Sequence, residues 1–186
     1  MLRPILTPAI RGDGVFGEEV KKDGRVSLSL RIKGVNLVTT HIQWVSTHGQ
    51  VEHEVVQYIE KSIGVIFPED YKSIARVNHG GSPIPDTFNL EEYGEGVINR
   101  LLSFNQDSPL YIIKVWESLK TLHRQPKEIV PFANDPFGNL YVFDYREGDN
   151  PTLAVYDHEE GDDPLSPLCN NFTEWISNLS DEEEEI

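Results

Sequence analysis

The densest group of side chains that could do chemistry lies at residues 157–163. It reads Asp157, His158, Glu159, Glu160, Gly161, Asp162 and Asp163. Carboxylate oxygens with an imidazole could hold a hard divalent cation. The spacing differs from the calcium-loop pattern D-x-[DN]-x-[DN]-G, and no second ligand set accompanies it. We therefore expect no metal site, and interpret the segment as a solvated loop or a surface that contacts a partner.

Nucleophilic chemistry has little support in the residue pattern. Cys169 is the only cysteine and has no adjacent histidine, and the six histidines, at positions 41, 48, 53, 79, 123 and 158, form no H-E-x-x-H pair. A serine or cysteine triad stays an alternative, because its members can lie far apart in a chain. We expect no catalytic residue and no cofactor, and hence a protein that is not an enzyme.

Two turn-forming segments could be mistaken for sites. The glycines of Asn78-His79-Gly80-Gly81 follow a predicted helix, whereas a phosphate cradle needs them before a helix N-terminus. Asp135-Pro136-Phe137-Gly138-Asn139 holds the residue types that a strand reversal requires. Both segments are predicted to serve the fold.

The hydrophobic spacing predicts four helices. Val51, Val55, Ile59 and Ile63 recur every four residues and predict a helix over 51–63. Three further helices are predicted to start at Pro68, at Ser108-Pro109 and at Asn171, the last with Glu174 as a capping box. Trp116 and Trp175 lie on apolar helix faces and are expected in the core.

Period-two patterns predict strands. Residues 25–32 and 35–45 are expected to form a hairpin after a loop over 11–24, and 87–90 and 96–104 a second hairpin joined by the acidic turn 91–94. Residues 65–67 are a short β-like step. Short turns join 129–133, 140–145 and 152–156, which favours an antiparallel meander, and a polar loop is expected over 157–167. The predicted class is α+β, an antiparallel meander packed by about four helices, with an N-terminal β-rich extension.

Charge is distributed unevenly over the 186 residues. The net charge is −15; residues 1–50 hold seven Lys/Arg against four Asp/Glu, and residues 51–186 hold nine against 27. An acidic body repels a phosphate backbone, so direct nucleic-acid binding is not expected. The same field favours a basic protein partner, although solubility alone is a commoner cause of acidity.

A single cysteine forms no internal disulfide, and the N-terminus lacks the apolar run of a secretory signal or membrane span. We expect a cytoplasmic protein with no membrane contact. The expected division is an extension of unknown role over 1–50, one domain over 51–180 and an acidic tail over 181–186.

Several motifs, in order, resemble the SUKH superfamily, which includes fungal cell-wall glucan-synthesis regulators. The first two are Phe67-Pro68-Glu69-Asp70-Tyr71-Lys72 and Val77-Asn78-His79-Gly80-Gly81. Residues 129–135 with 138–144 resemble the central hairpin of the family, 151–159 its next strand and 172–176 its closing helix. The resemblance covers residues 51–179.

This resemblance implies a bacterial immunity protein that binds and blocks a polymorphic toxin, commonly a nuclease, and the alternative is a regulatory or scaffolding adaptor like the fungal members. Nucleases carry basic surface, which agrees with the acidic charge found here. The oligomeric state is not predicted. The candidate partner-binding residues are Asp86, Glu91, Glu92, Asp135, Asp149, Asp157, Glu159, Glu160, Asp162 and Asp163.

Overall fold

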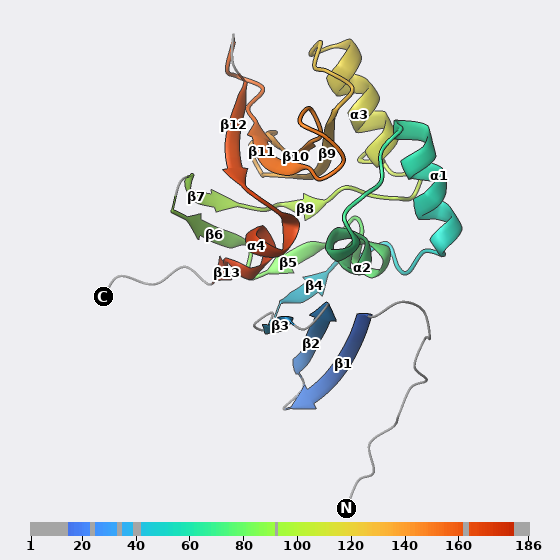
Figure 1. Ribbon diagram of the computed structural model, residues 1–186, viewed down its shortest axis with the longest axis vertical. Coiled ribbons are helices and arrows are strands. Elements are labelled where there is room, and N and C mark those ends of the chain that lie inside the picture. The colour runs from blue at the N-terminus through green and yellow to red at the C-terminus, as the bar shows by residue number, and fades with distance from the viewer. Residues whose placement is uncertain are drawn as a thin grey trace, which may run out of the picture. The chain divides into compact units, whose positions relative to one another are not determined.

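The structure of the protein is a computed structural model, drawn in Figure 1. It describes residues 15–22, 25–32, 35–38, 42–91, 93–161 and 164–180. The chain divides into two compact units, residues 1–41 and 42–186. In the described part of the chain, no helix is both long and apolar enough to cross a bilayer.

The first unit contains an antiparallel sheet with the order β1-β2-β3, formed by β1 (Val15–Lys22), β2 (Arg25–Ile32) and β3 (Val35–Val38). The predicted hairpin between β2 and the run after it is confirmed, although β3 ends at Val38. The prediction of a loop over 11–24 was wrong over 15–22, where β1 lies, and its remaining residues lie outside the described part of the chain. Lys22 pairs with Arg25, and the intervening Asp23-Gly24 is a dipeptide favoured in two-residue hairpin turns.

The main sheet of the second unit is an antiparallel meander with the order β12-β11-β10-β9-β8. The predicted central strands are confirmed as β9 (Ile129–Asn134), β10 (Leu140–Asp144) and β11 (Thr152–Tyr156). The loop predicted over 157–167 was wrong at its end, since β12 (Leu165–Cys169) forms the sheet edge. Proline is tolerated at an edge, which accommodates Pro167.

The run 96–104, predicted as one strand, is split between two sheets. β6 (Thr87–Leu90) pairs with β7 (Gly94–Val97) in the expected hairpin, and β13 (Leu179–Ser180) pairs with β6 on its other side. β8 (Arg100–Leu101) instead pairs with β9. The change of sheet occurs at Ile98 and Asn99.

A short pair outside these sheets joins β4 (Gln43–Val45) to β5 (Ser82–Ile84). β4 was predicted as the end of the N-terminal hairpin, and the structure pairs it within the second unit. The segment 82–86 was predicted as a loop, and its first three residues form β5. Residues 65–67 form no strand.

The described residues form four helices, as predicted, and these belong to the second unit: α1 (His53–Ile63), α2 (Glu69–Asn78), α3 (Ile112–Thr121) and α4 (Phe172–Ser177). α1 contacts both α2 and α3, and α2 contacts α4; α1 and α3 lie side by side in Figure 1. α3 starts four residues after Ser108, because the Ser108 hydroxyl accepts a hydrogen bond from Leu110 N in a turn that precedes the helix.

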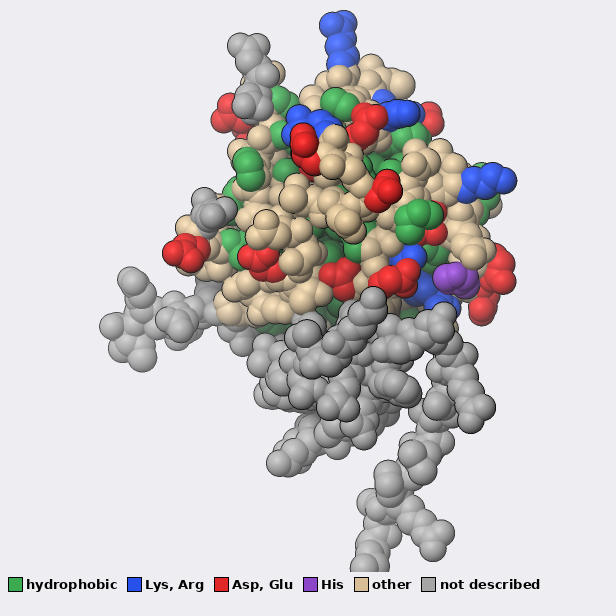
Figure 2. Space-filling model, viewed as in Figure 1, with side chains coloured by type: hydrophobic (Ala, Val, Ile, Leu, Met, Phe, Trp, Pro, Cys, Tyr) green, Lys and Arg blue, Asp and Glu red, His purple; other side chains and the backbone are tan. Residues whose placement is uncertain are grey.

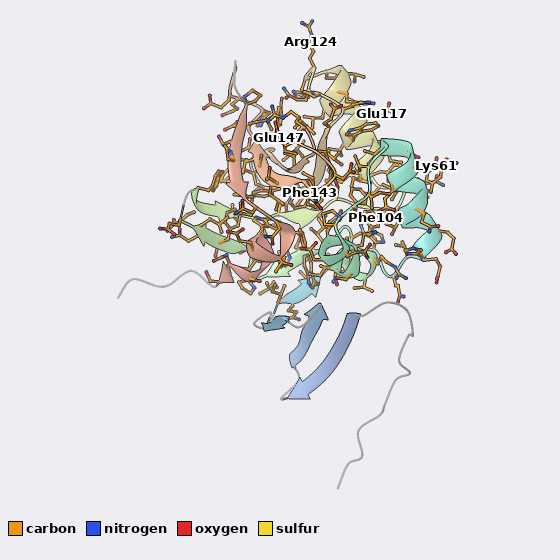
Figure 3. All side chains as sticks on the ribbon, viewed as in Figure 1. Lys61, Phe104, Glu117, Arg124, Phe143 and Glu147 are labelled. Atoms are coloured by element: carbon orange, nitrogen blue, oxygen red, sulfur yellow. The ribbon has the colours of Figure 1, made fainter. Side chains whose placement is uncertain are left out.

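The core is aromatic and centres on Tyr71, which is fully buried. Five phenylalanine rings surround it at centroid distances of 5.1–6.3 Å: Phe67, Phe104, Phe132, Phe143 and Phe172. Figure 3 shows Phe104 and Phe143 inside the second unit. Trp175 is fully buried and Trp116 is 5% exposed, so both are core residues as expected.

Candidate partner-binding surface

The acidic turns of the meander lie at two opposite ends of the main sheet. Leu140 pairs with both Asn134 and Tyr156, so the β9–β10 turn and the β11–β12 loop leave the sheet at the same end. Asp144 pairs with both Ile129 and Thr152, so the β10–β11 turn leaves at the other. The candidate residues Asp135, Asp157, Glu159 and Glu160 therefore gather at one end, and Asp149 lies at the opposite end.

The β9–β10 turn is built around the carboxylate of Asp135. Its Oδ1 accepts hydrogen bonds from Phe137 N and Asn139 N, both at 2.8 Å, and its Oδ2 accepts one from Asn139 Nδ2 at 2.9 Å. Asp135 is only 7% exposed. Three of the roughly four acceptor sites of this carboxylate are thus used within the turn, and a direct contact between Asp135 and a partner stays a prediction.

The same turn is joined to the β11–β12 loop through Asn139. Asn139 Oδ1 lies 3.0 Å from His158 Nδ1. Gly138 lies under the His158 ring, where an added Cβ would come within 3.2 Å of Cε1. Phe137, between these contacts, is 75% exposed. Sequence reasoning did not single out Phe137, because phenylalanine is ordinarily a core residue.

The β11–β12 loop presents its carboxylates beside this turn. Glu159 and Glu160 are exposed and Asp157 is half-buried. Asp157 Oδ1 accepts a hydrogen bond from Glu159 N at 2.9 Å, which shapes the loop. Asp162 and Asp163 lie outside the described residues.

The β6–β7 turn joins the same end of the sheet through Tyr93. Burial raises the pKa of the Tyr93 phenol, and the charges of Asp135 and Asp157 raise it further. Glu91 is exposed in this turn, and Glu92 lies outside the described residues. We name the set Glu91, Tyr93, Phe137, Asp157, His158, Glu159 and Glu160 the acidic turn surface.

The segments that carry Glu91 and the β11–β12 loop contain no Lys or Arg. Residues 77–99 contain neither, and residues 147–186 contain 13 Asp or Glu and no Lys or Arg. Asp86 is exposed at the start of β6, where its carbonyl accepts a hydrogen bond from Ile98 N. Cations at this end come from other segments, because Arg100 pairs with Asn134 and His123, next to Arg124, contacts the ring of Tyr156.

Other parts of the second unit carry both signs of charge. On the face in Figure 2, Asp and Glu side chains are interspersed with Lys and Arg side chains, and Figure 3 labels Lys61, Glu117, Arg124 and Glu147 there. In the β10–β11 turn, the Arg146 guanidinium binds the Asp144 carboxylate at 2.6 Å. Asp149 follows this pair, so the turn that carries it is of mixed charge.

No three His, Cys, Asp or Glu side chains of the described ranges converge as a possible metal-ligand set. Instead, a histidine and serine cluster occurs that sequence reasoning missed. Ser103 Oγ lies 2.8 Å from His48 Nδ1 and 3.4 Å from His79 Nδ1. Burial, with a contribution from His48, lowers the pKa of His79 to about 4.

The geometry of this cluster suits a structural role. Ser103 is fully buried, and its Oγ accepts a hydrogen bond from Asn105 N, so a substrate has no access to it. A cavity of about 380 Å³ lies next to it, lined by His48, Gly80, Arg100, Asn105, Asp107, Ser108, Pro109 and Leu110. An added Cβ on Gly80 would come within 2.6 Å of the His48 ring. Because Gly80 has no Cβ, the segment before α1 can pack against the end of α2.

The motif Phe67-Pro68-Glu69-Asp70-Tyr71-Lys72 also has a structural explanation. The Lys72 ammonium lies 2.7 Å from Glu69 and 3.3 Å from the buried Glu60, whose Oε1 accepts a hydrogen bond from Phe67 N. Burial lowers the pKa of Lys72, but the two carboxylates outweigh burial and leave the pKa raised. These contacts fix the connection between α1 and α2.

A family model described as SMI1 / KNR4 family (SUKH-1) matches residues 50–178. The chain belongs to this family. The motifs quoted above fall inside the match, and so do the described residues of the acidic turn surface. A search of curated proteins found no match. In this SUKH-1 chain, the scaffold includes α2, the glycines that follow it and α4. The exposed negative charge lies on the acidic turn surface, at one end of the main sheet.

Proposed function

We propose that this SUKH-1 protein is a non-enzymatic immunity protein that binds a basic protein toxin, of the nuclease class, and blocks it. The observation that carries the proposal is the gathering of Glu91, Asp157, Glu159 and Glu160 at one sheet end with no Lys or Arg in the segments that bear them. Such a surface competes with a nucleic acid for a basic cleft.

The exposed carboxylates of the acidic turn surface act mainly on the rate at which the protein and its partner associate. Exposed ion pairs each contribute about 0–1 kcal/mol, but a surface of one sign steers an oppositely charged partner over a distance of about one Debye length. The proposal therefore predicts an association rate that falls steeply with salt, more steeply than a neutral interface would.

The test begins with capture of the partner from the host, followed by its purification. We expect the captured protein to arrest growth when expressed alone and to be harmless when this chain is co-expressed. Its association rate should fall at least tenfold between about 50 and 500 mM salt. The double variant Glu159→Gln/Glu160→Gln should slow association at low salt, whereas Glu117→Gln, on the mixed face, should leave it unchanged.

A harmless captured partner would instead indicate the adaptor type of function. An association rate that is insensitive to salt would contradict the charge mechanism, even if the partner proves toxic.

A further inference from the structure

Phe137 is the feature of the acidic turn surface that charge does not explain. It is 75% exposed, at the tip of the β9–β10 turn. A single exposed apolar side chain is common in soluble proteins and needs no function. Ile66 is such a residue: it is 67% exposed between α1 and α2, and its carbonyl accepts a hydrogen bond from the Tyr145 hydroxyl at the other end of the main sheet. Phe137 differs from it in how its backbone is held and in what surrounds it.

The backbone that carries Phe137 is fixed from both sides. Asp135 accepts hydrogen bonds from Phe137 N and Asn139 N, and Asp135 N donates to Asn139 O at 3.1 Å. The Asn139 side chain is in turn held by His158. A phenylalanine has only two side-chain torsions, so burying it against a partner costs little conformational entropy when its backbone is already ordered.

The surroundings of Phe137 are polar and acidic. Gly138 lies against the His158 ring, and His158 lies between Asp157 and Glu159 in the chain, so the turn that carries Phe137 lies beside the acidic β11–β12 loop. Interfaces place a desolvated aromatic residue at the centre and leave charged residues on the rim. The acidic turn surface has both parts of this arrangement.

We infer that Phe137 is the apolar anchor of the acidic turn surface, and that the partner presents an apolar hollow bordered by Lys and Arg side chains. The inference rests on the proposed function and adds the residue that holds the complex together. The carboxylates set the association rate and its salt dependence. Burial of Phe137 sets the dissociation rate, and this rate depends little on salt because apolar burial is not screened by ions.

The first experiment places p-benzoylphenylalanine at position 137 or at position 66 of the full chain, expressed in the host, and irradiates the cells. We expect position 137 to cross-link to one protein that is basic overall, and position 66 to give no adduct with that protein. Equal labelling from both positions, or no adduct from position 137, would overturn the inference.

The second experiment purifies the partner that the cross-link identifies and measures its binding kinetics with Phe137→Ala and, as the matched control, Ile66→Ala. Truncation of a central anchor costs about 2 kcal/mol or more, which is about a 30-fold faster dissociation. We expect this change for Phe137→Ala at both low and high salt, and no change for Ile66→Ala.

The outcomes separate the anchor from the proposed function. If dissociation is unchanged in Phe137→Ala while Glu159→Gln/Glu160→Gln still slows association, the anchor is wrong and the acidic mechanism stands. If Phe137→Ala weakens binding to a basic partner that is not toxic, the anchor stands and the immunity function fails.

Discussion

Asp70 in α2 holds the start of α4, 103 residues later in the chain. Its Oδ2 accepts a hydrogen bond from Thr173 N at 2.9 Å and another from the Thr173 hydroxyl at 2.7 Å. A motif residue near the start of the domain thus positions its closing helix. This contact explains why an aspartate follows Pro68-Glu69 without any role in binding a partner.

Asp70→Ala should destabilise the domain by about 3–6 kcal/mol, because hydrogen bonds to a charged group contribute about 1.5–3 kcal/mol each and both bonds from Thr173 are lost, together with the local one from Tyr71 N. Urea unfolding followed by tryptophan fluorescence measures the loss. Thr173→Val removes only the hydroxyl donor and should cost about half as much. Equal stability of Asp70→Ala and the natural protein would show that this contact does not hold α4.

His79 should make the fold sensitive to mild acid. Burial keeps the folded-state pKa at about 4, below the ordinary value of 6.5. Above pH 6.5 the imidazole is neutral in the folded and the unfolded protein, so its titration does not lower the free energy of unfolding. As the pH falls from 6.5 towards 4, the unfolded chain binds a proton that the folded chain does not, and stability falls by about 2–3 kcal/mol.

His79→Asn should be less stable at pH 7, because it loses the stacking on Phe104, but its stability should change less between pH 7 and pH 4.5. The free energy of unfolding in urea, measured at several pH values, gives both quantities. A slope unaffected by His79→Asn would mean that another group causes the acid sensitivity.

Gly96 in β7 is required by the ring opposite it. An added Cβ would lie 2.3 Å from Cζ of Phe88, and Phe88 is only 2% exposed and packs against Trp175 at 6.0 Å. The ring therefore has little room to move. Gly96→Ala should cost about 1–3 kcal/mol, as over-packing in a core does.

Thermal unfolding checks this prediction, with Gly161→Ala as the control. An added Cβ on Gly161 meets nothing within 4 Å. The control should unfold at the temperature of the natural protein, and Gly96→Ala several degrees lower. If both variants unfold together, β7 can shift away from Phe88.

Long periodic segments were predictable from the sequence, and very short ones were not. The Val51 to Ile63 spacing predicted α1, and the short turns between apolar runs predicted the order β9, β10, β11. β8 and β13 have two residues each, too few for any period to appear. β12 contains Pro167, which argues against a strand unless the edge position is known.

The candidate surface was predictable in its charge but not in its geometry. The acidic composition of 157–163 indicated a partner-facing loop. The sequence could not show that the carboxylate of Asp135 turns inward while the ring of Phe137 turns outward, since both reverse the usual preferences of these residues. Nor could it show that Asp149 lies at the other end of the sheet, because that depends on strand order.

Asp135→Ala tests whether the buried carboxylate orders the turn that carries Phe137. Removing it deletes the acceptor of three hydrogen bonds, so the amide protons of Phe137 and Asn139 should exchange at least about tenfold faster, a loss of about 1.4 kcal/mol of local protection. Exchange followed residue by residue by NMR measures this. Asp157→Ala should leave both amides unchanged, because among the described residues its carboxylate bonds only Glu159 N. Asp135→Ala should also weaken partner binding, because the turn that carries Phe137 is then less ordered. Unchanged exchange at Phe137 and Asn139 would show that the turn is ordered without this carboxylate, and the pre-ordered backbone would no longer support Phe137 as the anchor.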